Sequence, residues 1–345
     1  MKAALHVGQL LQPVPGGIGR YVRSLVRVLP DAGVDVHAFA AGPKPAGVDG
    51  PYTDLGWPRG PLRYEAWHRL RRPAVRVPGD VVHATSLAVP PSGGRPLVVT
   101  VHDLVFLRQP EHLTPRGVAF HRRGLDLSRD ATVVVPTAYG RDDLAREGFD
   151  PARIVVAHHG VDPSPPPSPL PERPPYLLFV GTLEPRKGVA DLLDAHASLR
   201  MRHPDLELLL VGPAGWGEPL DLDRPGVVVV GNLGDADLDV AYRGAVALAH
   251  PARYEGFGLT VVEAMARGCP VVCTDAACLP EVAGGAATLV PVGDVAALAD
   301  ALEEVLGDGA RRAAMAAAGR DRAAHFTWAA SAEAHRQAYE LAVSR

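Results

Sequence analysis

Two glutamates, Glu255 and Glu263, stand eight positions apart in the segment RYEGFGLTVVEAMARG, residues 253–268. Carboxylates can exchange protons with a substrate, or they can accept hydrogen bonds from ligand hydroxyls. If residues 255–263 formed one helix, its rise of about 1.5 Å per residue would separate the two by about 12 Å. That exceeds the roughly 5 to 9.5 Å between the paired carboxylates of glycosidases. The spacing therefore favours ligand binding over hydrolysis.

Glycines flank the phenylalanine between these glutamates, at Gly256 and Gly258. They favour a loop around Glu255, so that a helix begins near Leu259 or Thr260. The two carboxylates can then face one ligand from different points along it.

A second candidate is the pair Arg186 and Lys187 in VGTLEPRKGVADLLDAH, where Gly181 ends an apolar run. The pair lies just before, or within, the first turn of a predicted helix. Cations are unfavourable at this positive end of a helix dipole, so two of them indicate an anion between their side chains and the backbone amides. A diphosphate suits them, since Arg pairs with it through two donors and Lys as a point charge. Solvated surface charge is the simpler alternative.

Near the start of the chain, PGGIGRYVRSLV places Gly16, Gly17 and Gly19 at the opening of a helix after the first apolar run. Bare backbone at a helix N-terminus suits a phosphate or another polar group. The spacing is not the dinucleotide G-x-G-x-x-G fingerprint, and a tight structural turn explains these glycines equally well.

Short apolar runs that resemble buried parallel strands alternate with helical patterns along the whole chain. Residues 163–175, PSPPPSPLPERPP, contain eight prolines and predict an extended connector that separates two domains. The pattern therefore predicts an α/β protein with two doubly wound, Rossmann-like domains, over residues 1–165 and 166–327. Open sheets of this kind bind ligands outside the carboxyl ends of their strands, so we expect the domains to face an interdomain cleft.

The composition excludes several classes of protein. Nearly half of the 345 residues are apolar, but no apolar run reaches the roughly 18 to 20 residues that span a bilayer. The first residues lack the form of a secretory signal, so we expect a cytoplasmic protein. The cysteines Cys269, Cys273 and Cys278 are expected to be reduced and buried, because three crowded cysteines fit neither a disulfide framework nor a zinc pattern.

Charge divides unevenly along the chain. Residues 1–165 carry 20 Lys and Arg against 15 Asp and Glu, while the whole chain has a net charge of −4. Arginines gather in residues 59–76, RGPLRYEAWHRLRRPAVR, either as a solvated helix face or as a surface for an anionic acceptor or membrane phosphates. Nucleic acid is an unlikely partner for an acidic chain without a binding motif.

These motifs, taken in order, resemble those of the family 4 retaining glycosyltransferases. YEGFGLTVVEAMARGCPVV resembles the E-x7-E segment of that family, and VGTLEPRKG resembles its Arg-Lys diphosphate motif. GGIGRYV, VTVHDL, VPTAYGRDDL, GNLGDADLDVAYRGA and LPEVAGGAATLV match in the same order. The resemblance covers nearly the whole chain.

The resemblance implies the GT-B fold, with a nucleotide-sugar bound mainly by the C-terminal domain and the acceptor mainly by the N-terminal one. A last helix, about 328–345, would cross back to the first domain. The implied reaction is a metal-independent transfer of a hexosyl group to a hydroxyl, with retention at the anomeric carbon and no cofactor. The acceptor would be a glycan, a lipid-linked molecule or a small molecule.

The resemblance also implies roles for individual residues. The catalytic set would be His102, Arg186, Lys187 and Glu255, although a satisfied strand-end histidine is the alternative for His102, and Asp103 is a weaker candidate. Arg186 and Lys187 would neutralise the diphosphate. Glu263 would accept from the ribose hydroxyls. The remaining donor-binding residues would be Gly16, Gly17, Gly181, Leu233, Glu255, Gly256, Phe257, Gly258 and Leu259.

Three positions depart from the family pattern: His159 stands where asparagine is usual, Thr260 replaces a frequent proline, and His250 replaces an apolar residue. VHDLVFLRQPEHL resembles the matching segment of mannosyltransferases and suggests GDP-mannose, while UDP- and dTDP-sugars stay open. A nucleotide-sugar epimerase or phosphorylase on the same fold, or a catalytically silent partner subunit, are the alternative functions. The basic first half suggests possible peripheral contact with the inner face of a membrane.

Overall fold

The computed structural model describes residues 1–163, 170 and 172–345, and it divides into two compact units. The first unit contains Met1–Gly160 and Thr327–Arg345, and the second contains Val161–Phe326. The predicted boundary at 165–166, and much of the proline-rich connector, lie outside the described residues. Each unit is described below by itself.

The first unit is built on a sheet of seven parallel strands in the order β3-β2-β1-β4-β5-β6-β7. The order reverses between β1 and β4, which is the topological switch point of a doubly wound sheet. The strands are β1 Lys2–His6, β2 Asp35–Ala40, β3 Tyr52–Asp54, β4 Val81–Ala84, β5 Leu97–Thr100, β6 Thr132–Val135 and β7 Ile154–Val156. All except β3 lie in apolar runs that the sequence predicts as strands.

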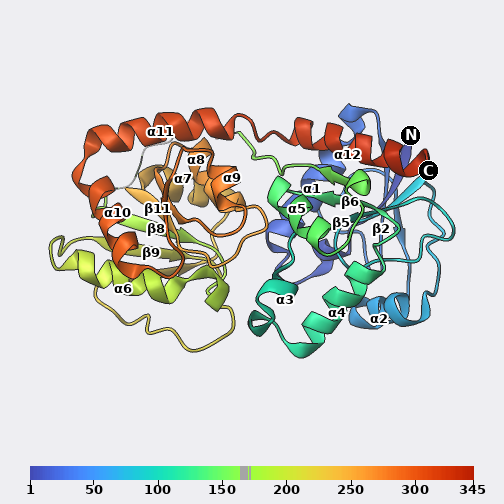
Figure 1. The fold of residues 1–345 in the computed structure, drawn as a ribbon, viewed down its shortest axis with the longest axis horizontal. Helices are drawn as coiled ribbons and strands as arrows, with labels where there is room; N and C mark the ends of the chain where they lie inside the picture. The colour runs from blue at the N-terminus through green and yellow to red at the C-terminus, as the bar shows by residue number, and fades with distance from the viewer. Residues whose placement is uncertain (164–169, 171) are drawn as a thin grey trace. The chain divides into compact units, whose positions relative to one another are not determined.

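Helices cover both faces of this sheet (Figure 1). The helices α1 and α12 pack on one face, while α2, α4 and α5 pack on the other. The helices of this unit are α1 Gly16–Val28, α2 Gly60–Leu70, α3 Val105–Arg108, α4 Pro115–Asp126, α5 Ala138–Arg146 and α12 Trp328–Val343, with short 3-10 turns at Gly8–Leu11 (η1), Pro30–Ala32 (η2), Pro110–His112 (η3) and Pro151–Arg153 (η4).

The arginine-rich stretch 59–76 is only partly the solvated helix face that its composition suggests. It forms α2, on which Trp67 and Arg63 are almost completely buried. The Arg63 guanidinium donates to the carbonyls of Pro58 and Leu55, at 2.8 and 2.9 Å. Backbone carbonyls thus satisfy a cation that would otherwise be costly to bury.

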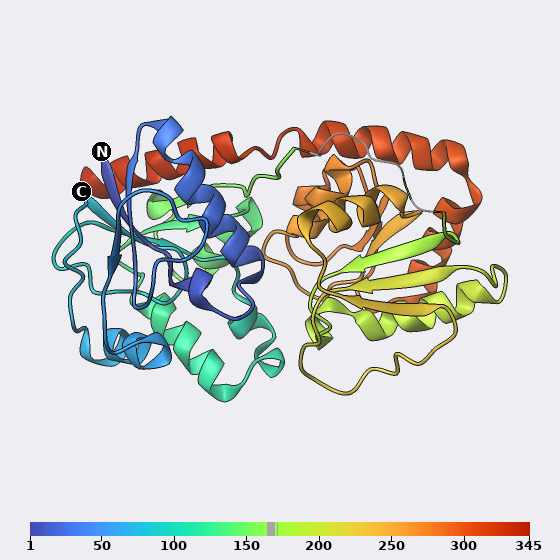
Figure 2. The ribbon, with the colours of Figure 1, turned by 180° about the vertical axis from the view of Figure 1, so that it is seen from behind.

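The second unit has a six-stranded parallel sheet in the order β10-β9-β8-β11-β12-β13, with its switch point between β8 and β11 (Figure 2). The strands are β8 Tyr176–Val180, β9 Glu207–Val211, β10 Val227–Gly231, β11 Ala247–His250, β12 Val271–Thr274 and β13 Thr288–Val290. The helices are α6 Val189–Arg200, α7 Asp235–Gly244, α8 Leu259–Ala266, α9 Leu279–Ala283, α10 Val295–Gly307 and α11 Gly309–Ala323, with a 3-10 turn η5 at Pro185–Lys187. Two Rossmann-like sheets are what the alternating pattern predicts, and that prediction is confirmed.

The three cysteines of this unit are free and buried, as expected. No helix in the described part of the chain is long and apolar enough to cross a membrane.

Helix α12 is joined to the first sheet by a buried polar network. His335 Nε2 lies 2.7 Å from Tyr21 Oη, and Tyr339 Oη lies 2.8 Å from His83 Nδ1. Tyr21 and His83 both reach Thr100 Oγ1, at 2.7 and 2.8 Å. Because α1, β4 and β5 supply these partners, the network ties the end of the chain to elements more than 200 residues away.

A single arrangement of protons satisfies this network. His335 Nδ1–H donates to the Ser331 carbonyl at 2.7 Å, which leaves Nε2 to accept from the Tyr21 hydroxyl. Tyr21 then accepts from Thr100, and Thr100 accepts from His83 Nε2–H. Both imidazoles are neutral in this arrangement, since each uses one nitrogen as donor and the other as acceptor.

Burial keeps these imidazoles neutral. It lowers the pKa of His335 to about 4 and that of His83 well below its ordinary value. His159, which stacks near Trp328 at the start of α12, is shifted in the same direction by burial. Protonation of any of them would place a charge in an apolar interior and break the donor order.

We therefore expect the first unit to lose stability as the pH falls from about 7.5 to about 5.5. Below a pH of about 6.5 these histidines bind protons in the unfolded chain but stay neutral in the folded one. Each therefore lowers the free energy of unfolding by up to about 1.4 kcal/mol per pH unit below its unfolded pKa. Hydrogen exchange of the α12 amides, corrected for intrinsic rates, measures this loss.

The His335→Gln variant should show a shallower pH dependence, while the variant of an exposed histidine of the other unit, His325→Gln, should match the wild type. Protection of α12 that stays constant between these pH values would contradict the assignment.

Candidate functional site

The charged residues predicted after two separate strands come together in the second unit. Arg186 and Lys187 lie in η5 after β8, and Glu255 lies in the loop after β11. Since β8 and β11 are hydrogen-bonded neighbours at the switch point, both loops leave the same edge of the sheet. This is the edge at which open α/β sheets bind ligands.

Close backbone contact holds the two loops together. Gly188 has a φ of 67°, and a Cβ atom there would lie 2.0 Å from the Pro251 carbonyl oxygen. The Arg253 amide also donates to the Arg186 carbonyl at 2.7 Å. Glycine at 188 is therefore required both by its backbone conformation and by the space available.

The Glu255 carboxylate is the centre of the cluster. Its Oε1 accepts from Lys187 Nζ, and its Oε2 lies 3.6 Å from Arg186 Nη1. Arg186 also pairs with Glu184 Oε1 at 2.7 Å and donates to the Tyr254 carbonyl at 3.1 Å. Protein carboxylates thus neutralise the two cations, and the Tyr254 carbonyl accepts a further hydrogen bond from Arg186.

Glu255 stays ionised in this setting. Burial would raise the pKa of its carboxyl, but Lys187, the hydrogen bond from His250 and Arg186 together hold it well below its usual range. At neutral pH the carboxylate can therefore accept hydrogen bonds and stabilise positive charge, but it has no proton to donate.

His250 and Thr260, two of the three departures from the family pattern, contact each other in this cluster. His250 Nε2 lies 3.0 Å from Glu255 Oε1, and its Nδ1 lies 3.4 Å from Thr260 Oγ1. Burial lowers the pKa of His250 despite the neighbouring carboxylate, so the ring is neutral at pH 7. Nε2–H then donates to Glu255 while Nδ1 accepts from the threonine hydroxyl, which sets the ring tautomer.

The second glutamate lies on α8, which begins at Leu259 as predicted. Glu263 is almost completely buried and accepts from Tyr242 Oη at 3.0 Å. Gly258 precedes the helix with a φ of 81°, and a Cβ atom there would lie 2.8 Å from Leu279 Cδ2. The turn between Glu255 and the helix therefore requires glycine at position 258.

The other donor-site candidates of this unit lie in the expected kinds of segment. Gly181 directly follows β8, and half-buried Leu233 lies between β10 and α7. Gly256 and Phe257 complete the loop before α8. Their roles as ligand contacts stay predictions.

Candidates from the first half of the chain lie in the first unit. Gly16 and Gly17 open α1 after η1. His102 follows β5, with Nε2 2.9 Å from the Thr85 carbonyl and its ring 5.0 Å from that of Tyr21. Burial lowers the pKa of His102, so the ring is neutral at pH 7 and Nε2–H donates to Thr85, leaving Nδ1 as an acceptor. Its catalytic role stays a prediction.

Two members of the cluster are not evident from sequence reasoning. Glu184 looks like an ordinary loop residue, yet it is buried and shares Arg186 with Glu255. His250 is visible in the sequence only as a departure from a pattern. Among residues 1–163, 170 and 172–345, no group of three or more His, Cys, Asp or Glu side chains is placed to hold a metal ion.

The two halves of the chain match two family profiles. Residues 15–165 match "Glycosyltransferase Family 4", and residues 162–322 match "Glycosyl transferases group 1". Together these matches cover most of both units.

Two curated relatives extend the likeness. The chain is 32% identical to O-antigen chain mannosyltransferase B of Escherichia coli, over 67% of this chain and 66% of the relative. It is 30% identical to D-inositol 3-phosphate glycosyltransferase of Frankia alni, over 99% of this chain and 98% of the relative.

Solved structures show the same fold. Sucrose-phosphate synthase from Thermosynechococcus elongatus superposes with a TM-score of 0.75 at 22% identity, covering 99% of this chain and 98% of that one. Anabaena HepE in complex with UDP and glucose superposes with a TM-score of 0.73 at 20% identity, covering 98% of each chain.

We expect Glu255→Gln to destabilise the second unit, because it removes the counter-charge of two mostly buried cations. The loss should be about 3 kcal/mol, at the lower end for a broken buried ion pair. Hydrogen exchange of the β8 and β11 amides measures it locally.

Glu303→Gln is the matched control in the same unit, since Glu303 pairs with Arg202 at the surface and should cost less than about 1 kcal/mol. Equal losses in the two variants would show that the Glu255 cluster does not stabilise the fold.

Proposed function

Because the chain belongs to the group 1 and family 4 glycosyltransferases, it is a hexosyltransferase that uses a nucleotide-sugar, and we propose that it transfers mannose from GDP-mannose to a hydroxyl acceptor. The convergence of Arg186 and Lys187 on Glu255 at the carboxyl ends of β8 and β11 carries the proposal. It supplies two cations and a carboxylate that is ionised at neutral pH, at the ligand-binding edge of one sheet.

In the proposed complex, the diphosphate of the donor takes over the two cations. Arg186 and Lys187 are mostly buried, so their attraction for phosphate is screened less than that of surface charges. Charge grows on the leaving phosphate as the glycosidic bond breaks, and cations already in place stabilise that charge. The pair thereby does the work for which other transferases use a metal ion.

Glu255 then turns from a counterion into a ligand for the sugar. Ionised carboxylates accept strong hydrogen bonds from sugar hydroxyls, and their charge favours an oxocarbenium-like transition state. His250 holds Glu255 through Oε1 and so restricts the orientation of the carboxylate. Glu263 would accept from the ribose hydroxyls, after exchanging the hydrogen bond that Tyr242 now donates to it.

The family resemblance supplies the stereochemical part of the proposal. The acceptor hydroxyl attacks from the face that the diphosphate leaves, and the departing phosphate accepts its proton, so that the anomeric configuration is retained. His102, after β5 in the first unit, would contact the transferring sugar, with its Nδ1 as an available acceptor. The glycines of GGIG would approach the diphosphate.

Mannose is favoured by two observations. The segment 101–113 resembles that of mannosyltransferases, and the relative at 32% identity is a mannosyltransferase by name. A glucosyl donor is the competing choice, because HepE was solved with UDP and glucose.

The donor preference can be read from thermal unfolding of the full chain with GDP, UDP or dTDP. A ligand that binds only the folded form stabilises it by RT ln(1 + [L]/Kd), which is about 2.7 kcal/mol at a hundredfold excess over Kd. GDP should raise the midpoint most. A larger rise with UDP would overturn GDP-mannose as the donor, and no rise with any of the three would overturn the proposed site.

Lys187→Ala should reduce turnover by a factor of about 10² to 10³, the usual effect of removing one preorganised group that stabilises transition-state charge. Release of nucleoside diphosphate, followed with a chelator present, measures it. Lys44→Ala is the matched control, because Lys44 is exposed in the first unit and donates to the Gly50 carbonyl. Undiminished release by the Lys187 variant would exclude the proposed stabilisation.

A further inference from the structure

The strand β11 ends on a histidine that lies against the Glu255 carboxylate. His250 is completely buried, and its backbone pairs in register with Cys273 of β12. Its Nε2 lies 3.0 Å from Glu255 Oε1. Because β11 is an interior strand of the six-stranded sheet, the imidazole is attached to a part of the fold that opens only rarely.

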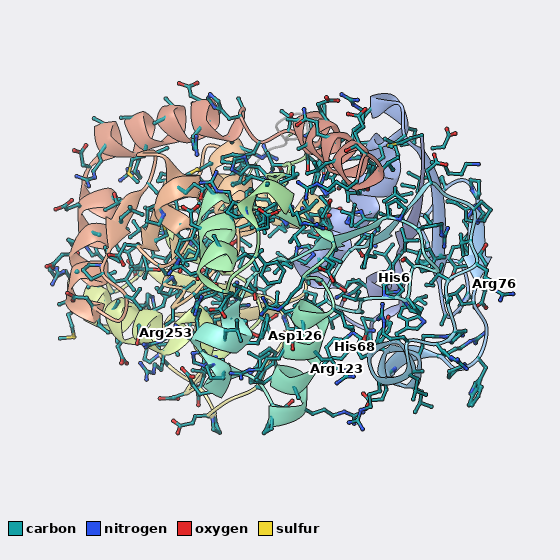
Figure 3. All side chains as sticks on the ribbon, turned by 45° about the vertical axis from the view of Figure 1, so that its right-hand side comes forward. His6, His68, Arg76, Arg123, Asp126 and Arg253 are labelled. Atoms are coloured by element: carbon teal, nitrogen blue, oxygen red, sulfur yellow. The ribbon has the colours of Figure 1, made fainter. Side chains whose placement is uncertain are left out.

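The backbone around Glu255 is held independently of its carboxylate. Arg253, which is labelled in Figure 3, lies on the same loop and pairs with Asp191 of α6 at 2.7 Å. The Glu255 carbonyl accepts a hydrogen bond from Cys278 Sγ at 3.2 Å. The feature of this loop that its side-chain partners must still set is therefore the orientation of the Glu255 carboxylate.

The partners of that carboxylate have different fates in the proposed reaction. Lys187 and His250 both contact Oε1, and Arg186 lies 3.6 Å from Oε2. A bound diphosphate takes over the lysine and the arginine, and their attraction for Glu255 is then shared with the phosphates. Of these three side chains, only the histidine has no part in diphosphate binding, so it is the one that can keep the carboxylate in place.

A neutral donor suits this task better than a cation does. Glu255 needs its negative charge to accept hydrogen bonds from sugar hydroxyls and to favour an oxocarbenium-like state. A cation at position 250 would offset that charge, whereas a neutral N–H group holds one oxygen and leaves the charge in place. Burial keeps the pKa of His250 low, so the ring is such a donor at neutral pH.

Thr260 influences which nitrogen of His250 carries the proton. It is the second residue of α8, and its Oγ1 lies 3.4 Å from His250 Nδ1. A hydroxyl that donates to Nδ1 leaves the proton on Nε2, from which the ring donates to Glu255. Proline at position 260 would leave Nδ1 without this partner, which is unfavourable for a buried nitrogen. The two departures from the family pattern are thus explained together, since the histidine needs the threonine.

We propose that His250 and Thr260 are positioning residues of the transfer reaction, which hold Glu255 in contact with the sugar once the donor diphosphate has engaged Arg186 and Lys187. The proposal rests on the transferase function proposed above, and it assigns roles to two residues that the family pattern does not contain. Each acts through Glu255 rather than on the reacting atoms.

The test follows release of GDP from GDP-mannose by the full chain, together with the Kd of GDP alone. His250→Leu keeps the position apolar and removes the N–H donor. It should lower kcat by a factor of about 10 to 100, the range found when a group that orients a functional side chain is removed. The Kd of GDP should stay at the wild-type value, because GDP carries no sugar for Glu255 to contact. If UDP raises the unfolding midpoint more than GDP, UDP-glucose and UDP replace this pair.

Conservative variants distinguish positioning from packing. His250→Gln should recover part of the lost turnover, because its amide can donate from near the place of the imidazole Nε2. Thr260→Val removes the hydroxyl with little change in shape and should lower kcat, while Thr260→Ser, which keeps the hydroxyl, should retain more activity. Adding Thr260→Val to His250→Leu should have no further effect, since residues that act through one contact are not additive.

His325→Leu is the matched control, since His325 is an exposed histidine of the same unit and should behave as the wild type does. Wild-type kcat in both His250→Leu and Thr260→Val would overturn the proposal. So would a Kd of GDP that rises as far as kcat falls, because His250 would then support the site as a whole. Thr260 is only half-buried, so its variants keep the test decisive if His250→Leu does not fold.

The wild type separates this proposal from the one on which it rests. If it binds GDP and releases GDP from GDP-mannose while the variants keep its kcat, only the positioning role is wrong. If it binds none of GDP, UDP and dTDP, the donor site itself is wrong and the positioning role fails with it. Lost turnover with unchanged GDP binding, recovered in part by His250→Gln, supports both.

Discussion

The Glu255 carboxylate is the interaction on which the second unit's site depends. It is buried, accepts hydrogen bonds from Lys187 and His250, and forms an ion pair with Arg186. Buried cations without a counter-charge would be strongly unfavourable, and a buried carboxylate without donors would be equally so. The cations and the carboxylate therefore stabilise one another, and they can do so only because the loops after β8 and β11 meet.

Internal partners also position Arg186 and Lys187, the two cations that we propose to bind a diphosphate: Glu255 pairs with both, and Glu184 pairs with Arg186. The neutral state of His250 fits this arrangement, because a buried imidazolium would compete with Lys187 for Glu255. Burial of the ring and the hydroxyl of Thr260 both favour the neutral tautomer that donates to the carboxylate.

In the first unit, a buried polar network links α12 to the sheet without any charged group. Its network of His83, Thr100, Tyr21, His335 and Tyr339 contains no formal charge, and every bond in it has a fixed direction. Neutral networks avoid the desolvation cost of buried ions but tolerate no protonation. Charged groups that are buried in this unit lie outside the network and have their own partners: Arg63 donates to backbone carbonyls, and Asp143 pairs with Arg108.

The sequence by itself determined the alternation of strands and helices, because buried parallel strands are short apolar runs and glycine turns mark their ends. It also indicated candidate site residues, since Arg186, Lys187, Glu255 and Glu263 stand in motifs whose order resembles that of a transferase family. Local patterns missed β3, whose three residues Tyr52–Asp54 are too few for a periodic signal, and the burial of Arg63, which depends on carbonyls outside the arginine's own helix.

Only the tertiary structure decided which residues meet. Glu184 carries no local signal, and His250 is visible only as a departure from a family pattern. Both join the cluster because sheet order brings β8 beside β11 and because Gly188 allows the backbone to approach Pro251. In the same way, arginines on α4 line a pocket because the tertiary structure places α2 beside α4. Periodicity along a chain reports which side of an element is buried, whereas the partner of a buried charge is set by strand order across the sheet.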